Sequence, residues 1–114
     1  MNKSPYFSII IPIRTITPYL KETIKALKDQ TYKSFELIVV DDKLSGIVSP
    51  AVKRNLGAKK AKGTYLAFID DDSFPDKHWL KNIYLQAKKH PSFAAFCGPC
   101  LTPPSDVITK KYYF

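Results

Sequence analysis

Three consecutive carboxylates, Asp70, Asp71 and Asp72, stand directly after the apolar run YLAFI. A second acidic pair, Asp41 and Asp42, follows another apolar run. Like charges placed side by side repel one another, so we expect a cation to neutralise them. Carboxylate oxygens are hard ligands that suit Mg²⁺ or Mn²⁺, and these ions also take phosphate oxygens. The residue types therefore indicate a divalent metal site that could bind a diphosphate.

Each acidic group also has a simpler interpretation. Asp72 or Ser73 could cap a following helix, and aspartate is common in turns where strands end. Besides metal binding, a second functional role is open to Asp41 and Asp42, since a carboxylate can equally accept hydrogen bonds from a base N–H or from ribose hydroxyls. The ligand-binding interpretation is favoured because a predicted buried strand leads into both groups.

The elements that must position these carboxylates alternate along the chain. Short, nearly continuous apolar runs predict buried strands at residues 7–13, 35–42, 64–70 and 92–97. Helical periodicity predicts helices within residues 17–30, 49–62 and 75–90, with Gly63 stopping the second. This alternation favours an α/β fold with a mainly parallel sheet and flanking helices. Ligands in such folds bind beyond the carboxyl ends of the strands, so both acidic groups are expected near one crevice.

The composition is typical of one small soluble domain. The chain has 114 residues, of which 45% are hydrophobic and 25% charged, and its formal net charge is +8. No apolar run approaches the roughly 20 residues of a membrane span, and the N-terminus is unlike a secretory signal. We therefore expect a cytoplasmic, reducing environment. The basic excess favours anionic partners such as nucleotides or an acidic membrane surface, although scattered lysines are also ordinary surface.

Four segments taken in order carry a resemblance to a known family: FSIIIPIR, FELIVVDDKLSG, VKRNLGAKKAKGTYLAFIDDDSFPDKHWL and FCGPCLTPP. Together they resemble the nucleotide-sugar-binding N-terminal half of family-2 glycosyltransferases, which have the Rossmann-like GT-A fold. The resemblance covers about Phe7 to Pro104. It implies transfer of a sugar, of hexosyl type, from a nucleotide-diphospho-sugar donor to an acceptor hydroxyl. It also implies a divalent metal, Mn²⁺ or Mg²⁺, that withdraws charge from the departing nucleoside diphosphate.

The resemblance assigns roles to matching residues outside the aspartate triplet. Pro12 and Ile13 match the end of the first strand, which lines the base and ribose pocket. Asp42 matches the carboxylate that contacts the donor base. Arg54 and Asn55 match a pair on the diphosphate side.

The aspartate triplet covers the DXD motif of the family. In the implied register, Asp71 faces the ribose and Asp72 holds the metal. Asp70 is an additional acid, which we include among the donor-binding residues, and it leaves the register open.

Two departures from the family pattern affect the functional prediction. Only eleven residues separate Asp42 from Arg54, fewer than is usual, so donor contacts from that segment are in question. The acceptor half with its catalytic base lies C-terminal to the matched segments, and the sequence ends at Phe114. We therefore expect residues 1–114 to form a single, truncated donor-binding domain whose catalytic base is unknown. The expected acceptor is a sugar or lipid-linked sugar, with peripheral contact at the inner face of the membrane as one option and no nucleic acid partner.

Three alternative functions remain open. The chain could be a non-catalytic nucleotide-binding or protein-interaction module. The pair Cys97 and Cys100 spells a thioredoxin-type CxxC, but Pro103 and Pro104 disfavour the helix that such a motif needs. A receiver-like signalling domain also gathers acidic residues around Mg²⁺, yet its acidic pair ends the first strand, whereas here a strand and a helix come before it.

Overall fold

The computed structural model describes residues 3–45, 49–98 and 112–113. The chain forms two compact units that interleave along the sequence. The first unit comprises Met1–Thr17 and Ser34–Asp71, and the second comprises Pro18–Lys33 and Asp72–Phe114. Each unit is described separately.

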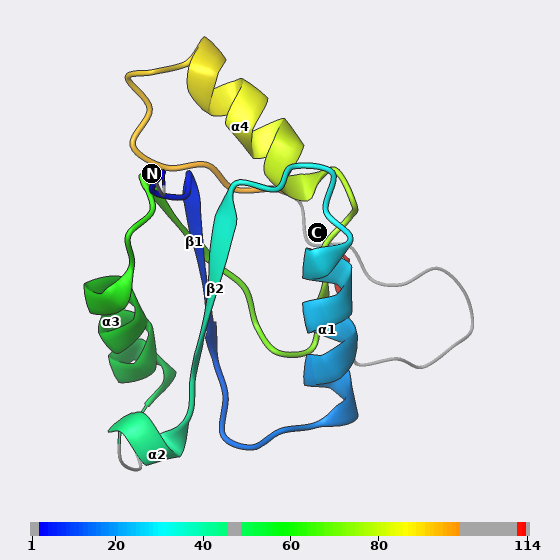
Figure 1. Cartoon of the computed structure of the whole chain (residues 1–114), viewed down its shortest axis with the longest axis vertical. Helices are drawn as coiled ribbons and strands as arrows, with labels where there is room; N and C mark the ends of the chain where they lie inside the picture. The colour runs from blue at the N-terminus through cyan, green and yellow to red at the C-terminus, as the bar shows by residue number, and fades with distance from the viewer. Residues whose placement is uncertain (1–2, 46–48, 99–111, 114) are drawn as a thin grey trace. The chain divides into compact units, whose positions relative to one another are not determined.

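A three-stranded parallel sheet is the centre of the first unit (Figure 1). Strand β1 (Phe7–Pro12) lies between β2 (Phe35–Val40) and β3 (Tyr65–Phe68). Every residue of β1 is buried, as expected for a continuous apolar strand with partners on both edges. The predicted α/β class with a mainly parallel sheet is confirmed.

Helix α3 (Pro50–Lys60) packs against β1 and β2 (Figure 1), and the short α2 (Asp42–Ser45) precedes it. Its start is the predicted one, because the Ser49 side chain accepts a hydrogen bond from the Val52 N–H and proline follows. Its end differs from the prediction. The helix stops at Lys60, where the next residue is extended, rather than at Gly63.

A polar network joins the amino-terminal ends of β1 and β2 to the segment before β3. The Ser8 hydroxyl and the Lys62 N–H both donate to Glu36 Oε1, each at 2.6 Å. The Gly63 N–H donates to Ser8 Oγ at 2.8 Å. These bonds lower the pKa of the Glu36 carboxyl, the Ser8 hydrogen bond most, because they favour its charged form.

Replacing Glu36 with glutamine is expected to lower the free energy of unfolding by about 1 kcal/mol at pH 7, because an amide oxygen accepts these bonds more weakly. A lowered folded-state pKa stabilises the fold above the unfolded-state pKa, and this contribution is lost as pH falls below about 4.5. Urea unfolding at pH 7 and pH 3.5 measures the effect, with exposed Asp29→Asn as the control. The gap between wild type and variant should narrow at the lower pH, and an unchanged gap would contradict the assignment.

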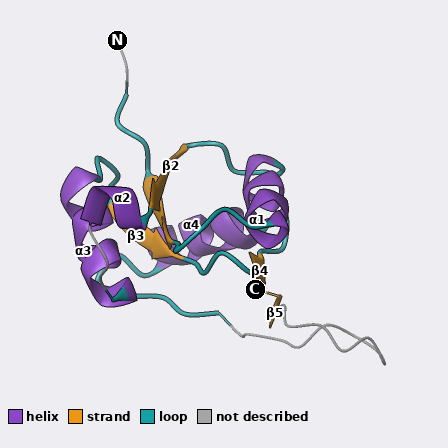
Figure 2. Ribbon diagram, turned by 90° about the horizontal axis from the view of Figure 1, so that it is seen from below, coloured by secondary structure: helices purple, strands orange, loops and turns teal. Residues whose placement is uncertain are grey.

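The second unit contains helices α1 (Pro18–Lys28) and α4 (Trp79–Lys89) and a two-stranded parallel pair, β4 (Ser73–Phe74) with β5 (Tyr112–Tyr113) (Figure 2). The Thr23 hydroxyl of α1 donates to the Ser73 carbonyl at 2.7 Å, which ties the helix to β4. The predicted strand at residues 92–97 is wrong. That segment is mostly exposed loop, because an apolar run becomes a strand only where a neighbour accepts its backbone hydrogen bonds.

Gln30 connects α1 to the start of α4 within the second unit. Its side chain is fully buried, donates to the carbonyls of Ala26 and Asp76, and accepts the Leu80 N–H at 3.1 Å. His78, the residue before α4, makes no capping bond with its own side chain. Gln30, in the segment that follows α1, therefore supplies the acceptor that the first turn of α4 needs.

Helix length also bears on membrane insertion. The three longest helices of the described segments, α1, α3 and α4, have 11 residues each. None of the helices in the described part of the chain is long and apolar enough to cross a membrane.

Candidate functional site

The carboxyl-terminal edge of the first unit's sheet gathers residues from three chain segments. Ile13 follows β1 and donates its N–H to the Val40 carbonyl at the end of β2, at 2.9 Å. Asp42 lies two residues beyond β2, and Asp70 lies two residues beyond β3. Since β2 and β3 flank β1, both predicted acidic groups begin at the same edge of one sheet.

The two aspartates after β2 have different surroundings. Asp41 Oδ1 accepts the Lys43 N–H at 3.0 Å, an arrangement that starts the short helix α2. Asp42 is the first residue of that helix, and its side chain forms an ion pair with Lys53. Of the two aspartates, Asp42 is therefore the one whose carboxylate is bound by a side chain of α3.

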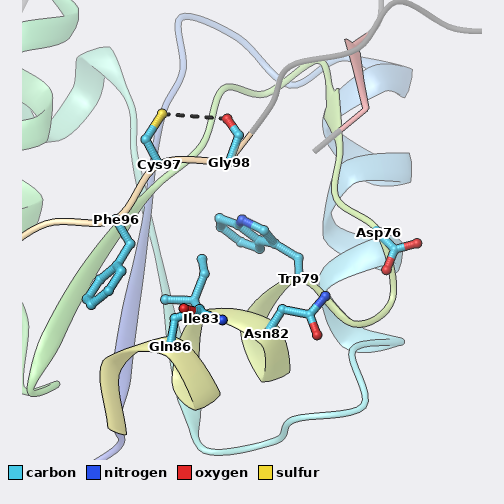
Figure 3. A pocket seen from close by; sticks show the side chains of 8 residues that line it. All are labelled: Asp76, Trp79, Asn82, Ile83, Gln86, Phe96, Cys97 and Gly98. Atoms are coloured by element: carbon cyan, nitrogen blue, oxygen red, sulfur yellow. Dashed lines mark hydrogen bonds between the residues drawn. The ribbon is translucent and has the colours of Figure 1, made fainter. Parts of the chain in front are cut away.

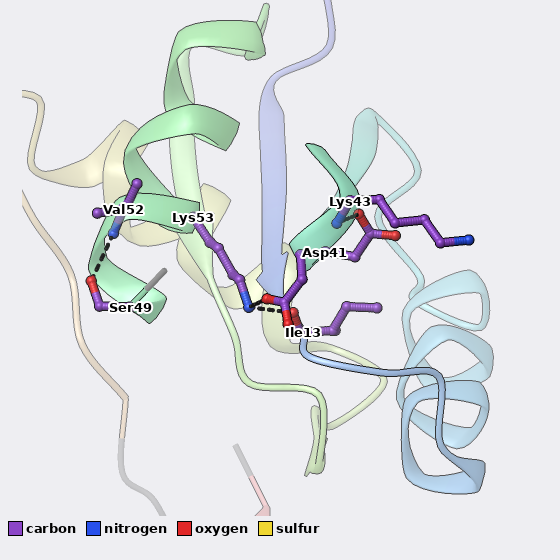
Figure 4. Close-up of polar contacts among 7 residues, drawn as sticks. Ile13, Asp41, Lys43, Ser49, Val52 and Lys53 are labelled. Atoms are coloured by element: carbon purple, nitrogen blue, oxygen red, sulfur yellow. Dashed lines mark hydrogen bonds and ion pairs between the residues drawn. The ribbon is translucent and has the colours of Figure 1, made fainter. Parts of the chain in front are cut away.

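Lys53 is the buried centre of this edge (Figure 4). Its side chain extends from α3 to the end of β1, where its ammonium donates to the Ile13 carbonyl at 2.7 Å. The same ammonium pairs with Asp42, whose side chain is 32% exposed while that of Lys53 is 2% exposed. One cation thus links the ends of β1 and β2, and part of the Asp42 carboxylate remains open to solvent.

A second ion pair involves the additional acid of the triplet. Arg54 Nη2 lies 3.0 Å from Asp70 Oδ1, and the two side chains are 37% and 60% exposed. Exposed pairs of this kind contribute about 0–1 kcal/mol. The pair therefore places Arg54 beside the triplet without fixing it there.

The other residues predicted for the site occupy varied positions. Pro12 is buried at the end of β1, and Asn55 is exposed on α3 next to Arg54. Asp71 is the last residue of the first unit, and Asp72 begins the second chain segment of the second unit. Their individual donor-binding and metal-binding roles stay predictions.

The carboxylates at this edge suit a divalent ion that brings further ligands with it. Among residues 3–45, 49–98 and 112–113, no three acidic, histidine or cysteine side chains converge on one point. Mg²⁺ bound with a nucleotide typically uses only one or two carboxylates, with phosphate oxygens and waters completing the shell. Aspartates directly after a strand therefore fit an ion that arrives with its diphosphate, but not a metal cage formed by protein alone.

The second unit contains a hollow of about 530 Å³ beside α4 (Figure 3). Trp79 and Ile83 line it from the helix, and Phe96 and Cys97 from the loop that follows. Cys97 is exposed in that loop rather than at a helix N-terminus, so it lacks the helix dipole that activates a CxxC thiol. Cys100 lies outside the described residues.

Sequence reasoning did not assign a role to Lys53, and the signal that could have found it is modest. Lys53 lies four residues before Gly57, so the two share one face of α3. A lysine on the buried face of a helix requires a partner for its charge, and the acidic pair after β2 was the nearest predicted candidate.

A parallel sheet with acidic side chains at its carboxyl edge, covered by α3, defines an α/β protein of the class whose ligands bind beyond the carboxyl ends of the strands. The sequence profile described as glycosyl transferase family 2 matches residues 8–45 and 48–108. The chain belongs to this family, and the predicted GT-A fold is confirmed by the structural comparison below. The receiver-like interpretation is thereby left without support.

The comparisons include both sequences and solved structures. The chain is 32% identical to an uncharacterized glycosyltransferase of Rickettsia conorii, over 71% of this chain and 16% of that protein. It is 29% identical to poly(ribitol-phosphate) beta-N-acetylglucosaminyltransferase TarS of Staphylococcus aureus, over 75% of this chain and 19% of the relative. The crystal structure of TarS 1–349 superposes with a TM-score of 0.66 at 25% identity, over 75% of this chain and 33% of that one. The chain thus spans less than a fifth of these two curated relatives.

Proposed function

We propose that this chain is the donor-binding part of a metal-dependent glycosyltransferase that uses a nucleotide-diphospho-sugar. The observation that carries the proposal is that two acidic groups follow β2 and β3 at one edge of the sheet, in a chain of this family. The name of TarS, an N-acetylglucosaminyltransferase, supports a donor of hexosyl type.

Different residues of the first unit bind different parts of the donor. The partly exposed carboxylate of Asp42 accepts hydrogen bonds from the base, and the backbone at Pro12 and Ile13 borders the nucleoside. Arg54, only loosely paired with Asp70, exchanges that partner for a diphosphate oxygen, with Asn55 beside it. Because Asp70 is paired with Arg54, the register in which Asp71 meets the ribose and Asp72 binds metal is preferred.

Asp72 is proposed to hold Mn²⁺ or Mg²⁺, which when bound would stabilise the charge on the departing nucleoside diphosphate. The proposed acceptor is a sugar or a lipid-linked sugar, reached in the cytoplasm or at the inner membrane face. The formal net charge of +8 supports contact with an anionic lipid surface.

Calorimetric titration of the chain with UDP, GDP and dTDP is expected to give binding to at least one of them that strengthens about a hundredfold or more with Mn²⁺. The physical reason is that the ion offsets repulsion between aspartates and diphosphate. Equal binding without metal, or no binding to any of the three, would contradict the proposal. Sugar transfer or donor hydrolysis by this chain would exclude the non-catalytic alternative.

A further inference from the structure

A buried ammonium at the edge of the sheet has no role in the donor-binding scheme above. The Lys53 side chain is 2% exposed, so its charge has left most of its water. Desolvating an ammonium is unfavourable unless charge pairing and hydrogen bonds compensate. Both are present, because Nζ pairs with Asp42 and donates to the Ile13 carbonyl. A surface lysine that merely improves solubility would not be arranged in this way.

The packing of α3 explains how Lys53 reaches this position. A Cβ atom at Gly57, one turn further along the same face, would lie 2.6 Å from Ile10 Cγ2 of β1. The missing side chain allows the helix to lie close to the sheet. The lysine stem can then extend past the end of β1 to the carboxylate after β2 (Figure 4).

We infer that Lys53 is a positioning residue, which fixes the Asp42 carboxylate for the donor nucleoside and keeps divalent metal away from it. The inference rests on the proposed function and deepens it. The Lys53 ammonium orients the Asp42 carboxylate toward the end of β1. The Asp42 side chain is 32% exposed, which leaves a carboxylate oxygen open for a base N–H. A buried positive charge in contact with Asp42 also repels a divalent cation. The two acidic groups therefore have separate tasks, nucleoside binding after β2 and metal binding after β3.

The test separates the nucleoside from the diphosphate. Titrations of the 114-residue chain use the nucleoside diphosphate that wild type binds, and separately pyrophosphate, each with Mn²⁺. Lys53→Met should weaken the affinity for the nucleoside diphosphate roughly ten- to a hundredfold, by analogy with the cost of removing a residue that orients a metal ligand. Pyrophosphate should bind as in wild type. Lys59→Met, an exposed lysine on the same helix, is the matched control and should change neither affinity.

A double variant tests whether Lys53 acts through Asp42. In the Asp42→Asn background, Lys53→Met should lower the affinity for the nucleoside diphosphate no further, because the carboxylate that Lys53 orients is already gone. If Lys53 had only a general structural role, Lys53→Met would weaken the affinities for both ligands in both backgrounds. That result would overturn the inference. Equal affinities of wild type and Lys53→Met for the nucleoside diphosphate would also overturn it.

Two further outcomes keep the test decisive. If Lys53→Met fails to fold, NMR of the Lys53 ammonium in the wild-type chain takes the place of the titrations of this variant. Its ¹⁵N signal should shift with the nucleoside diphosphate but not with pyrophosphate, and equal shifts with both would overturn the inference. If the wild-type chain binds no nucleotide, both the proposed function and the inference are overturned. If wild type binds and Lys53→Met binds with the same affinity, only the inference is overturned.

Discussion

Replacing Asp72 with alanine is expected to reduce the affinity for nucleoside diphosphate in Mn²⁺ by about a hundredfold, or ~2.7 kcal/mol. The reason is the proposed division of the triplet, in which Asp70 engages Arg54 and Asp72 provides the carboxylate for the ion. Removing that ligand leaves the ion held by phosphate oxygens and water alone. Affinity measured without metal should change little. Calorimetry with and without Mn²⁺ measures both effects.

Two control variants sharpen this test. Asp29→Ala removes an exposed acid just after α1 and should leave both affinities unchanged. Asp70→Ala should weaken binding only a few-fold and retain the dependence on Mn²⁺. A loss of metal dependence in Asp70→Ala rather than in Asp72→Ala would show that the register is shifted by two residues. Fluorescence of Trp79, the only tryptophan, checks that the second unit stays folded in each variant.

The largest expected effect on stability is that of Gly63→Ala, about 3 kcal/mol or more of lost unfolding free energy. A Cβ atom here would lie 2.6 Å from both the backbone nitrogen and Oγ of Ser8, and 2.7 Å from the carbonyl carbon of Phe7. Backbone atoms of a central buried strand cannot move aside as a flexible side chain can. The same displacement would also disturb the hydrogen bond from the Gly63 N–H to Ser8.

Thermal and urea unfolding followed by circular dichroism measures this effect, with an expected fall in melting temperature of ~10 °C or more. Gly98→Ala is the matched control. A Cβ at Gly98 meets no atom of the described residues within 4 Å, so the stability of this variant should stay within about 0.5 kcal/mol of wild type. A Gly63→Ala variant as stable as Gly98→Ala would contradict the close packing of this segment on β1.

Apolar periodicity was sufficient to predict the central strands and three helices. Runs such as FSIIIP are buried throughout, and only a strand with neighbours on both edges uses such a pattern. The Ser49–Pro50 start of α3 was predicted because capping chemistry is local. The segment at 92–97 was predicted wrongly, since pairing with a neighbour is not a local property. The pair of β4 with β5 was missed for the same reason.

The residue types and their order were enough to place two acidic groups beyond two parallel strands and to indicate the family. Contacts between distant segments were decided only by the tertiary structure. One such contact is that of the Lys53 ammonium with the Asp42 carboxylate and the Ile13 carbonyl. Others are the Arg54–Asp70 ion pair and the hydrogen bond by which Gln30 caps α4. The physical reason is that burial removes water from a polar group and makes a partner obligatory, while the partner's identity depends on which segments the fold brings together.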